Sequence, residues 1–294
     1  MADTPGIVPR AEILLIGGSS TFSLRFPEDL ADPGVRVLEP RLVFDTPYGP
    51  SPRLSLFELD GRRVLTVKMH GWRSGITRAD ASRQLFWVAQ QAGVTRVLAE
   101  GGVGSISRLL ELRDLVIPDD YIDVSVRKDV GLGGPYLLSM RDPLCPDLRR
   151  ALADAAVAAA LAELGARPGR LPRRVFTRGV YANTDGRHFE SRAEVQMLAR
   201  AGADVVGQSL CPEVYLAREI GACYAGIHMV VNYAEGVVAD WRHEDLKDLF
   251  YGEAAAIGRI LLDALRRIPA ERACACPSFR HPTLLVDREE GDTC

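Results

Sequence analysis

The sequence predicts an α/β fold that forms a single domain over residues 1–294. Short β-branched apolar runs alternate with longer segments of helical periodicity, and glycines or small polar residues follow most of the apolar runs. This alternation is typical of parallel strand pairing with helices on both faces of a sheet. The 294 residues are 47% apolar, which is enough for one sizeable core.

The elements follow from local patterns along the chain. The clearest short helix has Ala81, Leu85, Val88 and Ala92 on one face and ends at Gly93. The proline-rich segment 40–54 is expected to be a structured loop. The expected strands cover 11–20, 62–71, 95–105, 202–210 and 223–234, and the expected helices cover 78–93, 145–165, 189–202 and 243–268.

Composition excludes several classes of function. The net charge of −3 argues against a nucleic-acid-binding surface, which needs a basic excess. No run approaches 18 apolar residues, and the first ten residues lack the pattern of a signal peptide, so we expect no membrane association and a cytoplasmic protein. Only Cys274 and Cys276 are close among the six cysteines, and no second ligand pair is near them. We therefore expect no metal site, but a reduced pair or a local disulfide.

Ligands of such folds bind at the carboxyl ends of the strands. That rule predicts one crevice lined by the segments GGSS, MHGWR, EGGVGS, QSLCPE and VNYA. GGSS offers backbone N–H groups and hydroxyls to an anion, although an ordinary structural turn explains it equally well. EGGVGS is expected to be a second small-residue turn.

Three polar residues in or near these segments are candidates for chemistry. His70 follows a strand, Glu190 follows Phe189, and Asn232 ends a very apolar strand. A packed histidine and a capping asparagine are the structural alternatives. A carboxylate and an amide could together recognise a purine, with the amide facing O6 and N7 and the carboxylate facing N1–H.

Four segments carry a resemblance to a known family: FDTPYGPSPRL (44–54), DLVIPDDYID (114–123), GRHFESRAE (186–194) and GADVVGQSLCPEVYLAREIGACYAGI (202–227). Over nearly its whole length the chain resembles the trimeric purine nucleoside phosphorylases and methylthioadenosine phosphorylases. The resemblance implies a twisted mixed central sheet flanked by helices and a homotrimer with sites at subunit interfaces. It also implies a pentosyltransferase of purine salvage that uses inorganic phosphate as co-substrate and needs no cofactor.

The resemblance also implies roles for individual residues. Ser19, His70, Ser209 and the N–H groups near Gly102 would bind phosphate, and Phe189 would stack on the base or ribose. Glu190 and Asn232 would hold a 6-oxopurine, and Asn232 would stabilise charge on the departing base. His243 would contact a free 5′-hydroxyl, which favours inosine or guanosine over 5′-methylthioinosine.

Four positions depart from the family pattern. The phosphate-binding arginine falls on Met69, a Thr or Asn on Gly101, the methionine beneath the ribose on Gln208, and a His or Tyr on Ser74. A charged hydrogen bond is worth about 1.5–3 kcal/mol, so phosphate binding would weaken unless another cation replaces the arginine. Arg73 is a better replacement than Lys68, which should point away from Met69's side of the strand. The alternatives are a phosphate-independent hydrolase, a base-exchange transferase and a non-catalytic purine-binding protein.

Overall fold

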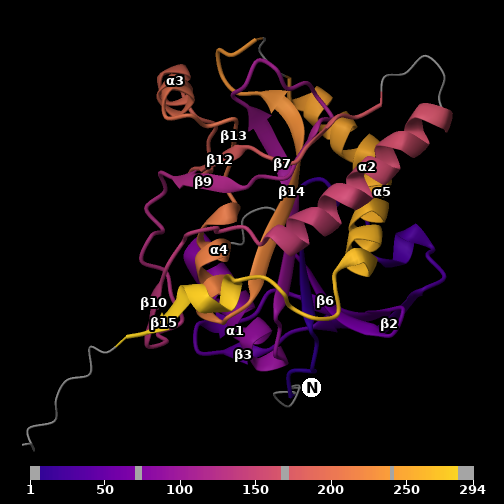
Figure 1. The fold of residues 1–294 in the computed structure, drawn as a ribbon, viewed down its shortest axis with the longest axis vertical. Coiled ribbons are helices and arrows are strands. Elements are labelled where there is room, and N and C mark those ends of the chain that lie inside the picture. Colours follow the sequence, from indigo (N-terminus) through magenta and orange to yellow (C-terminus); the bar gives the residue numbers. More distant parts are fainter. Residues whose placement is uncertain (1–6, 70–74, 167–171, 239–241, 284–294) are drawn as a thin grey trace, which may run out of the picture.

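The computed structural model describes residues 7–69, 75–166, 172–238 and 242–283. Its central feature is one twisted, mixed sheet with helices packed on both faces (Figure 1). The strands of this sheet are β1 (Ile13–Gly17), β2 (Val35–Leu42), β5 (Leu54–Leu59), β6 (Arg62–Lys68), β7 (Arg96–Ser105), β8 (Leu115–Val116), β9 (Asp120–Asp123), β11 (Val175–Phe176), β12 (Val180–Asn183), β13 (Val205–Gly207) and β14 (Cys223–Tyr233).

The remaining elements are helices and two small strand pairs. The helices are α1 (Arg78–Ala92), α2 (Pro146–Ala166), α3 (Arg192–Arg200), α4 (Leu210–Glu219) and α5 (His243–Arg267), with short 3₁₀ turns η1 (Glu28–Leu30) and η2 (Cys276–Phe279). The strand pairs are β3 (Asp45–Thr46) with β4 (Gly49–Pro50), and β10 (Tyr136–Leu138) with β15 (Arg280–Pro282). None of the helices in the described ranges is long and apolar enough to cross a membrane.

The centre of the sheet is parallel, and antiparallel pairs join it to the flanking strands β5, β8 and β13, beyond which the pairs β8–β11, β13–β12 and β12–β9 are again parallel. β1 lies between β6 and β7, and β14 pairs with β7, all in parallel. β5 pairs antiparallel with β6, and β2 with β5. Only Asp60 and Gly61, both with positive φ, connect β5 to β6, and a two-residue link makes a hairpin rather than a crossover. The mixed sheet is therefore confirmed, whereas uniform parallel pairing is wrong for the flanking strands.

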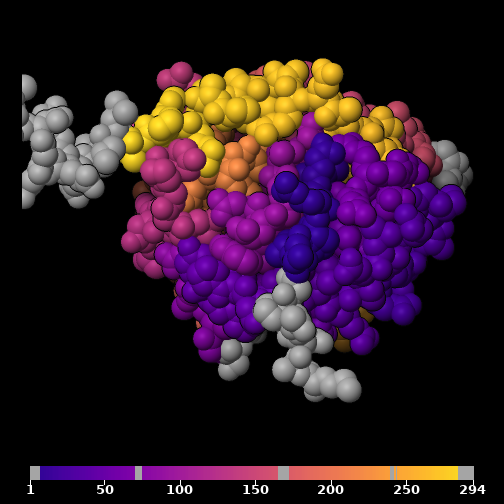
Figure 2. Space-filling model, turned by 90° about the horizontal axis from the view of Figure 1, so that it is seen from below, coloured from indigo at the N-terminus to yellow at the C-terminus, as the bar shows by residue number. Residues whose placement is uncertain are grey.

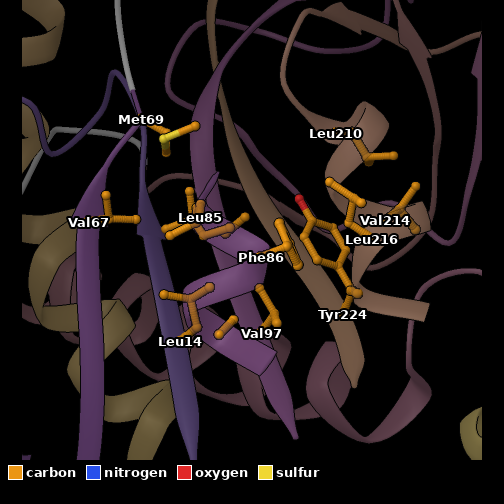
Figure 3. Packing of buried hydrophobic residues seen from close by; sticks show 14 of the residues in the cluster. Leu14, Val67, Met69, Leu85, Phe86, Val97, Leu210, Val214, Leu216 and Tyr224 are labelled. Carbon is orange, nitrogen blue, oxygen red and sulfur yellow. The ribbon is translucent and has the colours of Figure 1, made fainter. Parts of the chain in front are cut away.

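The core consists of one apolar layer on each face of the sheet. Leu14 and Ile16 of β1 face a cluster covered by α1 and α4, while Ile13 and Leu15 face a cluster covered by α2 and α5. This alternation follows from the two-residue period of a strand whose two faces are both buried. Figure 3 shows the α1–α4 layer, in which side chains from α1 and α4 meet those of the strands.

The helix at 78–93 is confirmed in detail. The Thr77 side chain accepts the Asp80 N–H at 3.0 Å, and Gly93 ends the helix in the left-handed conformation. All four predicted core positions of this helix are buried.

Several local expectations were wrong. Segment 40–54 is not simply a loop, because it contains the end of β2 and the β3–β4 hairpin. EGGVGS is not a turn, because β7 continues through it to Ser105. The helix expected from residue 189 begins only at Arg192, because Ser191 is its N-cap and forms a capping box with Glu194.

Candidate functional site

A cavity of about 300 Å³ opens at the carboxyl ends of the central strands. It is lined by residues from the loop after β1, from Met69 after β6, from the second half of β7 and from the end of β14. The segment before α3, the β13–α4 junction and the first turns of α5 complete its wall. The crevice expected from strand topology therefore exists, at the expected ends of the strands.

The first wall of the cavity is the glycine loop after β1. A Cβ atom on Gly18 would lie 2.2 Å from the backbone oxygen of Glu100, so only glycine lets this loop approach β7 so closely. The Gly102 N–H donates to Ser19 Oγ at 2.7 Å. Two groups expected to bind phosphate are thus hydrogen-bonded to each other, and the Ser19 hydroxyl proton still has a free direction in which to donate.

The same loop holds a buried carboxylate that the sequence reasoning did not identify as functional. Glu100 Oε1 accepts the Gly18 N–H at 2.5 Å, the Thr21 N–H at 3.1 Å and the Thr21 hydroxyl at 2.6 Å. Burial raises the pKa of Glu100, and these hydrogen bonds oppose the rise. Glu100 therefore occupies N–H groups that an external anion could otherwise use.

Arg78 places a cation beside Met69 in the wall of the cavity. Met69 is 7% exposed and packs at the cavity end of the α1–α4 layer (Figure 3). Arg78, the first residue of α1, donates from Nη1 to the Met69 carbonyl oxygen at 2.9 Å, and its side chain lines the cavity. Its guanidinium therefore lies next to the position where the family resemblance predicts an arginine.

The Arg78 side chain faces a buried partner carboxyl group. Arg78 Nη2 lies 3.7 Å from Glu213 Oε1, while the Tyr224 hydroxyl donates to Glu213 Oε2 at 2.9 Å. Burial raises the pKa of Glu213 to about 7, and Arg78 and Tyr224 oppose that rise. Within the described ranges the buried Arg78 Nε has no hydrogen-bond partner, whereas Nη2 lies beyond hydrogen-bond distance of Glu213 and so keeps donor capacity for a ligand.

The base-recognition candidates reach the cavity from distant parts of the chain. Glu190 is held by a hydrogen bond from the Thr184 hydroxyl to its Oε1 at 2.6 Å. Asn232 donates from Nδ2 to the Tyr233 carbonyl oxygen at 2.9 Å, which uses one of its two amide protons. Both side chains line the cavity, as does the half-exposed Phe189. The structure thus brings together the carboxylate, the amide and the aromatic ring that the sequence singled out.

Gln208 and Ser209 line the wall where α4 begins. Gln208 donates from Nε2 to the His188 carbonyl oxygen at 2.9 Å, and the Ser209 N–H donates to the Tyr181 hydroxyl at 3.4 Å. Tyr181 reaches this point because Gly207 has no Cβ, which would lie 2.1 Å from the tyrosine hydroxyl.

His228 lies behind this wall. Its ring packs against Tyr181 with 4.9 Å between centroids and the ring planes tilted by 53°, and burial lowers the pKa of His228 to about 3. Neither ring nitrogen has a hydrogen-bond partner in the described part of the chain. A Cβ on Gly226 would lie 2.7 Å from His228 Nε2, so glycine at that position leaves room for the neutral imidazole.

The side chains of four residues singled out from the sequence are not among those described. His70 and Arg73, together with Ser74, lie outside the described residues. His243 begins α5, but its side chain is not among those described.

The sequence reasoning missed Arg78, Glu100 and Glu213. Glu100 was predictable, because an acidic residue inside the apolar strand 95–105 indicates a buried carboxylate, and such a group requires hydrogen-bonding partners. Arg78 gave no such signal, since charged residues in the first turn of a helix are usually solvated. The expectation that Cys274 and Cys276 lack a second ligand pair is also wrong, because folding brings Cys145 and Cys223 to them.

The chain is similar in sequence and in fold to known nucleoside phosphorylases. A model of the phosphorylase superfamily matches residues 12–266. A probable 6-oxopurine nucleoside phosphorylase of Thermococcus kodakarensis is 31% identical over 279 residues, covering 90% of this chain and 95% of that protein. The S-methyl-5′-thioadenosine phosphorylase of Pyrococcus abyssi is 32% identical over 270 residues, covering 90% of this chain and 96% of that protein. Among solved structures, a methylthioadenosine phosphorylase from an Antarctic soil metagenomic library superposes with a TM-score of 0.73 at 25% identity, covering 92% of this chain and 91% of that one. The resemblance that the sequence motifs predict is confirmed.

Proposed function

The chain belongs to the phosphorylase superfamily, and we propose that it cleaves the N-glycosidic bond of a 6-oxopurine nucleoside and transfers the sugar to phosphate. The observation that carries this proposal is the presence of Glu190 and Asn232 in one cavity. Glu190 accepts from N1–H, and from the 2-amino group of guanine, while the second Asn232 amide proton is donated to O6 or N7. The substrates are inosine, guanosine or 5′-methylthioinosine.

Cleavage leaves negative charge on the departing base and positive charge on the sugar. In the proposal, Asn232 stabilises the charge that develops on the base, because a preorganised donor acts most strongly where charge appears in the transition state. Phe189 covers the base or ribose, Gln208 lies beneath the sugar, and His243 contacts a free 5′-hydroxyl. These interactions place the sugar carbon that carries the base towards the end of the cavity at which the attacking group binds.

The attacking group binds between the glycine loop and α1. Ser19, Ser209 and His70 orient phosphate in this proposal, with the Gly102 N–H holding the Ser19 hydroxyl in place and Arg78 or Arg73 as the cation. Support for Arg78 is its hydrogen bond to the Met69 carbonyl oxygen, its place in the cavity wall and its Nη2 group, which is 3.7 Å from Glu213. No cofactor other than the co-substrate phosphate is required. The proposal extends to a homotrimer in the cytoplasm that serves purine salvage, and light scattering of the purified protein would test the assembly.

One observation favours a second candidate, in which water or another base replaces phosphate. Glu100 already occupies the Gly18 and Thr21 N–H groups of the loop, and Met69 cannot donate to an anion. A hydrolase or a base-exchange transferase would need no anion site there. The base pocket would have the same role in either reaction.

The experiment incubates the purified protein with inosine in phosphate-free buffer and with phosphate added. We expect hypoxanthine release to depend on phosphate and to match ribose 1-phosphate formation mole for mole. Equal release without phosphate would instead support the hydrolase. Tight nucleoside binding by calorimetry with no turnover with phosphate, water or a free base would support a non-catalytic purine-binding protein.

A further inference from the structure

Four cysteines converge at a point remote from the cavity. Cys145 immediately precedes α2, Cys223 begins β14, and Cys274 and Cys276 lie in the segment after α5. Their four Sγ atoms all lie within 4.8 Å of one another, and the Sγ atoms of Cys223 and Cys274 are 3.3 Å apart. Because Cys223 and Asn232 are at opposite ends of β14, this cluster is distinct from the proposed active site.

We propose that these four thiols bind one Zn²⁺ ion as a structural site. Zinc in such sites is tetrahedral, with Zn–S bonds of about 2.3 Å, so neighbouring sulfur atoms should be about 3.8 Å apart. The observed 3.3 Å and the 4.8 Å limit bracket that value. Four sulfur ligands and no open position are the composition of a structural rather than a catalytic zinc site, and soft thiolates select zinc over magnesium or calcium.

Burial of the cluster supports a closed site. Cys145, Cys223 and Cys276 are at most 5% exposed and belong to the apolar layer beneath α2 and α5, while Cys274 is half-buried. All four are free thiols in this structure.

The surroundings can stabilise the net negative charge of a zinc–tetrathiolate group. The backbone N–H groups of Asp147 and Leu148, in the first turn of α2, point to the Cys145 sulfur. Arg218 donates to the Cys276 carbonyl oxygen at 3.4 Å, and Arg272 donates to the Gly221 carbonyl oxygen at 2.9 Å. The N-terminus of α2 stabilises negative charge on Cys145, and the two arginine bonds hold the backbone of the segments that carry the ligands, as outer-shell groups do in metal sites.

The site would connect the C-terminal segment to the body of the protein. This segment, yellow in Figure 2, forms a band along the surface, and its strand β15 pairs with β10. A zinc ion would join it to the starts of α2 and β14, which are far apart in the sequence. Its loss should therefore lower the thermal transition temperature and loosen this segment first.

The test measures zinc by mass spectrometry in the full-length, tag-free protein, produced with zinc present and purified under reducing conditions. We expect about one zinc per chain in the wild type and none in Cys274→Ser. Cys211→Ser is the matched control, because Cys211 is a buried thiol outside the cluster, and it should keep the ion. Circular dichroism checks that both variants are folded.

A second measurement does not depend on any variant. Wild-type protein loaded with Co²⁺ should show the intense visible absorption of a tetrahedral cobalt thiolate, which added zinc removes. The proposal is overturned if the reduced protein binds no zinc, if Cys274→Ser keeps it, or if the cobalt spectrum is that of oxygen ligands. Intact-mass analysis that finds two disulfides among these four cysteines in freshly isolated protein would also overturn it.

Discussion

Replacement of Arg78 by methionine tests the cation assigned to the phosphate end of the cavity. Arg78 is held by its 2.9 Å hydrogen bond to the Met69 carbonyl oxygen, and its Nη2 is 3.7 Å from Glu213, too far for a hydrogen bond. We assign it one charged hydrogen bond to phosphate, worth about 1.5–3 kcal/mol. At about 1.4 kcal/mol per tenfold change, Arg78→Met should raise the KM for phosphate by roughly ten- to a hundredfold.

The assay follows hypoxanthine release from saturating inosine while the phosphate concentration is varied. Arg83→Met is the matched control, because Arg83 lies on the same helix and donates to the Gly131 carbonyl oxygen outside the cavity. The double variant Arg78→Met with Glu213→Gln removes the carboxylate that would otherwise be left buried without its cation. It should have the same raised KM for phosphate as the single variant.

Two results would refute this reasoning. The KM for phosphate could stay unchanged in Arg78→Met, which would leave His70 or Arg73 as the groups that bind the anion. Alternatively, Arg78→Met could raise the KM for inosine alone, which would show that the guanidinium contacts the nucleoside.

Three further predictions concern the base pocket, the buried carboxyl group and the core. Asn232→Asp should shift the ratio of kcat/KM values towards 6-aminopurine nucleosides, and Glu190→Ala should weaken inosine and guanosine more than adenosine; unchanged ratios would remove the substrate assignment. In urea unfolding, the free energy of unfolding of Glu213→Gln should rise relative to that of the wild type by about 3 kcal/mol between pH 4 and pH 8. The reason is that the wild-type carboxyl group, with its pKa raised from 4.5 to about 7, contributes stability that is complete below pH 4.5 and lost as the pH rises through 7. A difference between the two proteins that stays constant with pH would contradict the raised pKa. Phe86→Ala, at a fully buried position of α1, should lower the unfolding free energy by about 3–5 kcal/mol, and a loss below about 1 kcal/mol would show that the layer repacks.

The base end of the cavity was predictable because its signals are local. Asn232 is a polar residue at the end of a continuous apolar strand, and β14 is buried along nearly its whole length. Glu190 precedes Ser191, whose capping box fixes the start of α3 and so the direction of the chain before it. A short stretch of sequence therefore determines the position of each side chain.

The phosphate end was less predictable because its contacts are long-range. Glu100 accepts hydrogen bonds from residues about eighty positions away, and Arg78 reaches the cavity because α1 packs against α4, which carries Glu213. The cysteine cluster has the same character, since Cys223 is 51 residues from Cys274 along the chain and Cys145 is farther still. Periodicity within a segment contains no information on which remote segment will cover it.

The proposed base end and phosphate end of the cavity differ in the groups that line them. In the proposed function a carboxylate and an amide hold the leaving group at the base end, whatever group attacks the sugar. Among the described residues that line the proposed phosphate end, the one cation is Arg78, beside the buried carboxyl groups Glu100 and Glu213, and Arg127 also acts on Glu213. An ionised carboxyl group there weakens the attraction of Arg78 for a phosphate dianion, whereas a protonated one does not. Burial raises the pKa of Glu213 to about 7 and raises that of Glu100, so burial of these groups favours the state in which Arg78 attracts the anion.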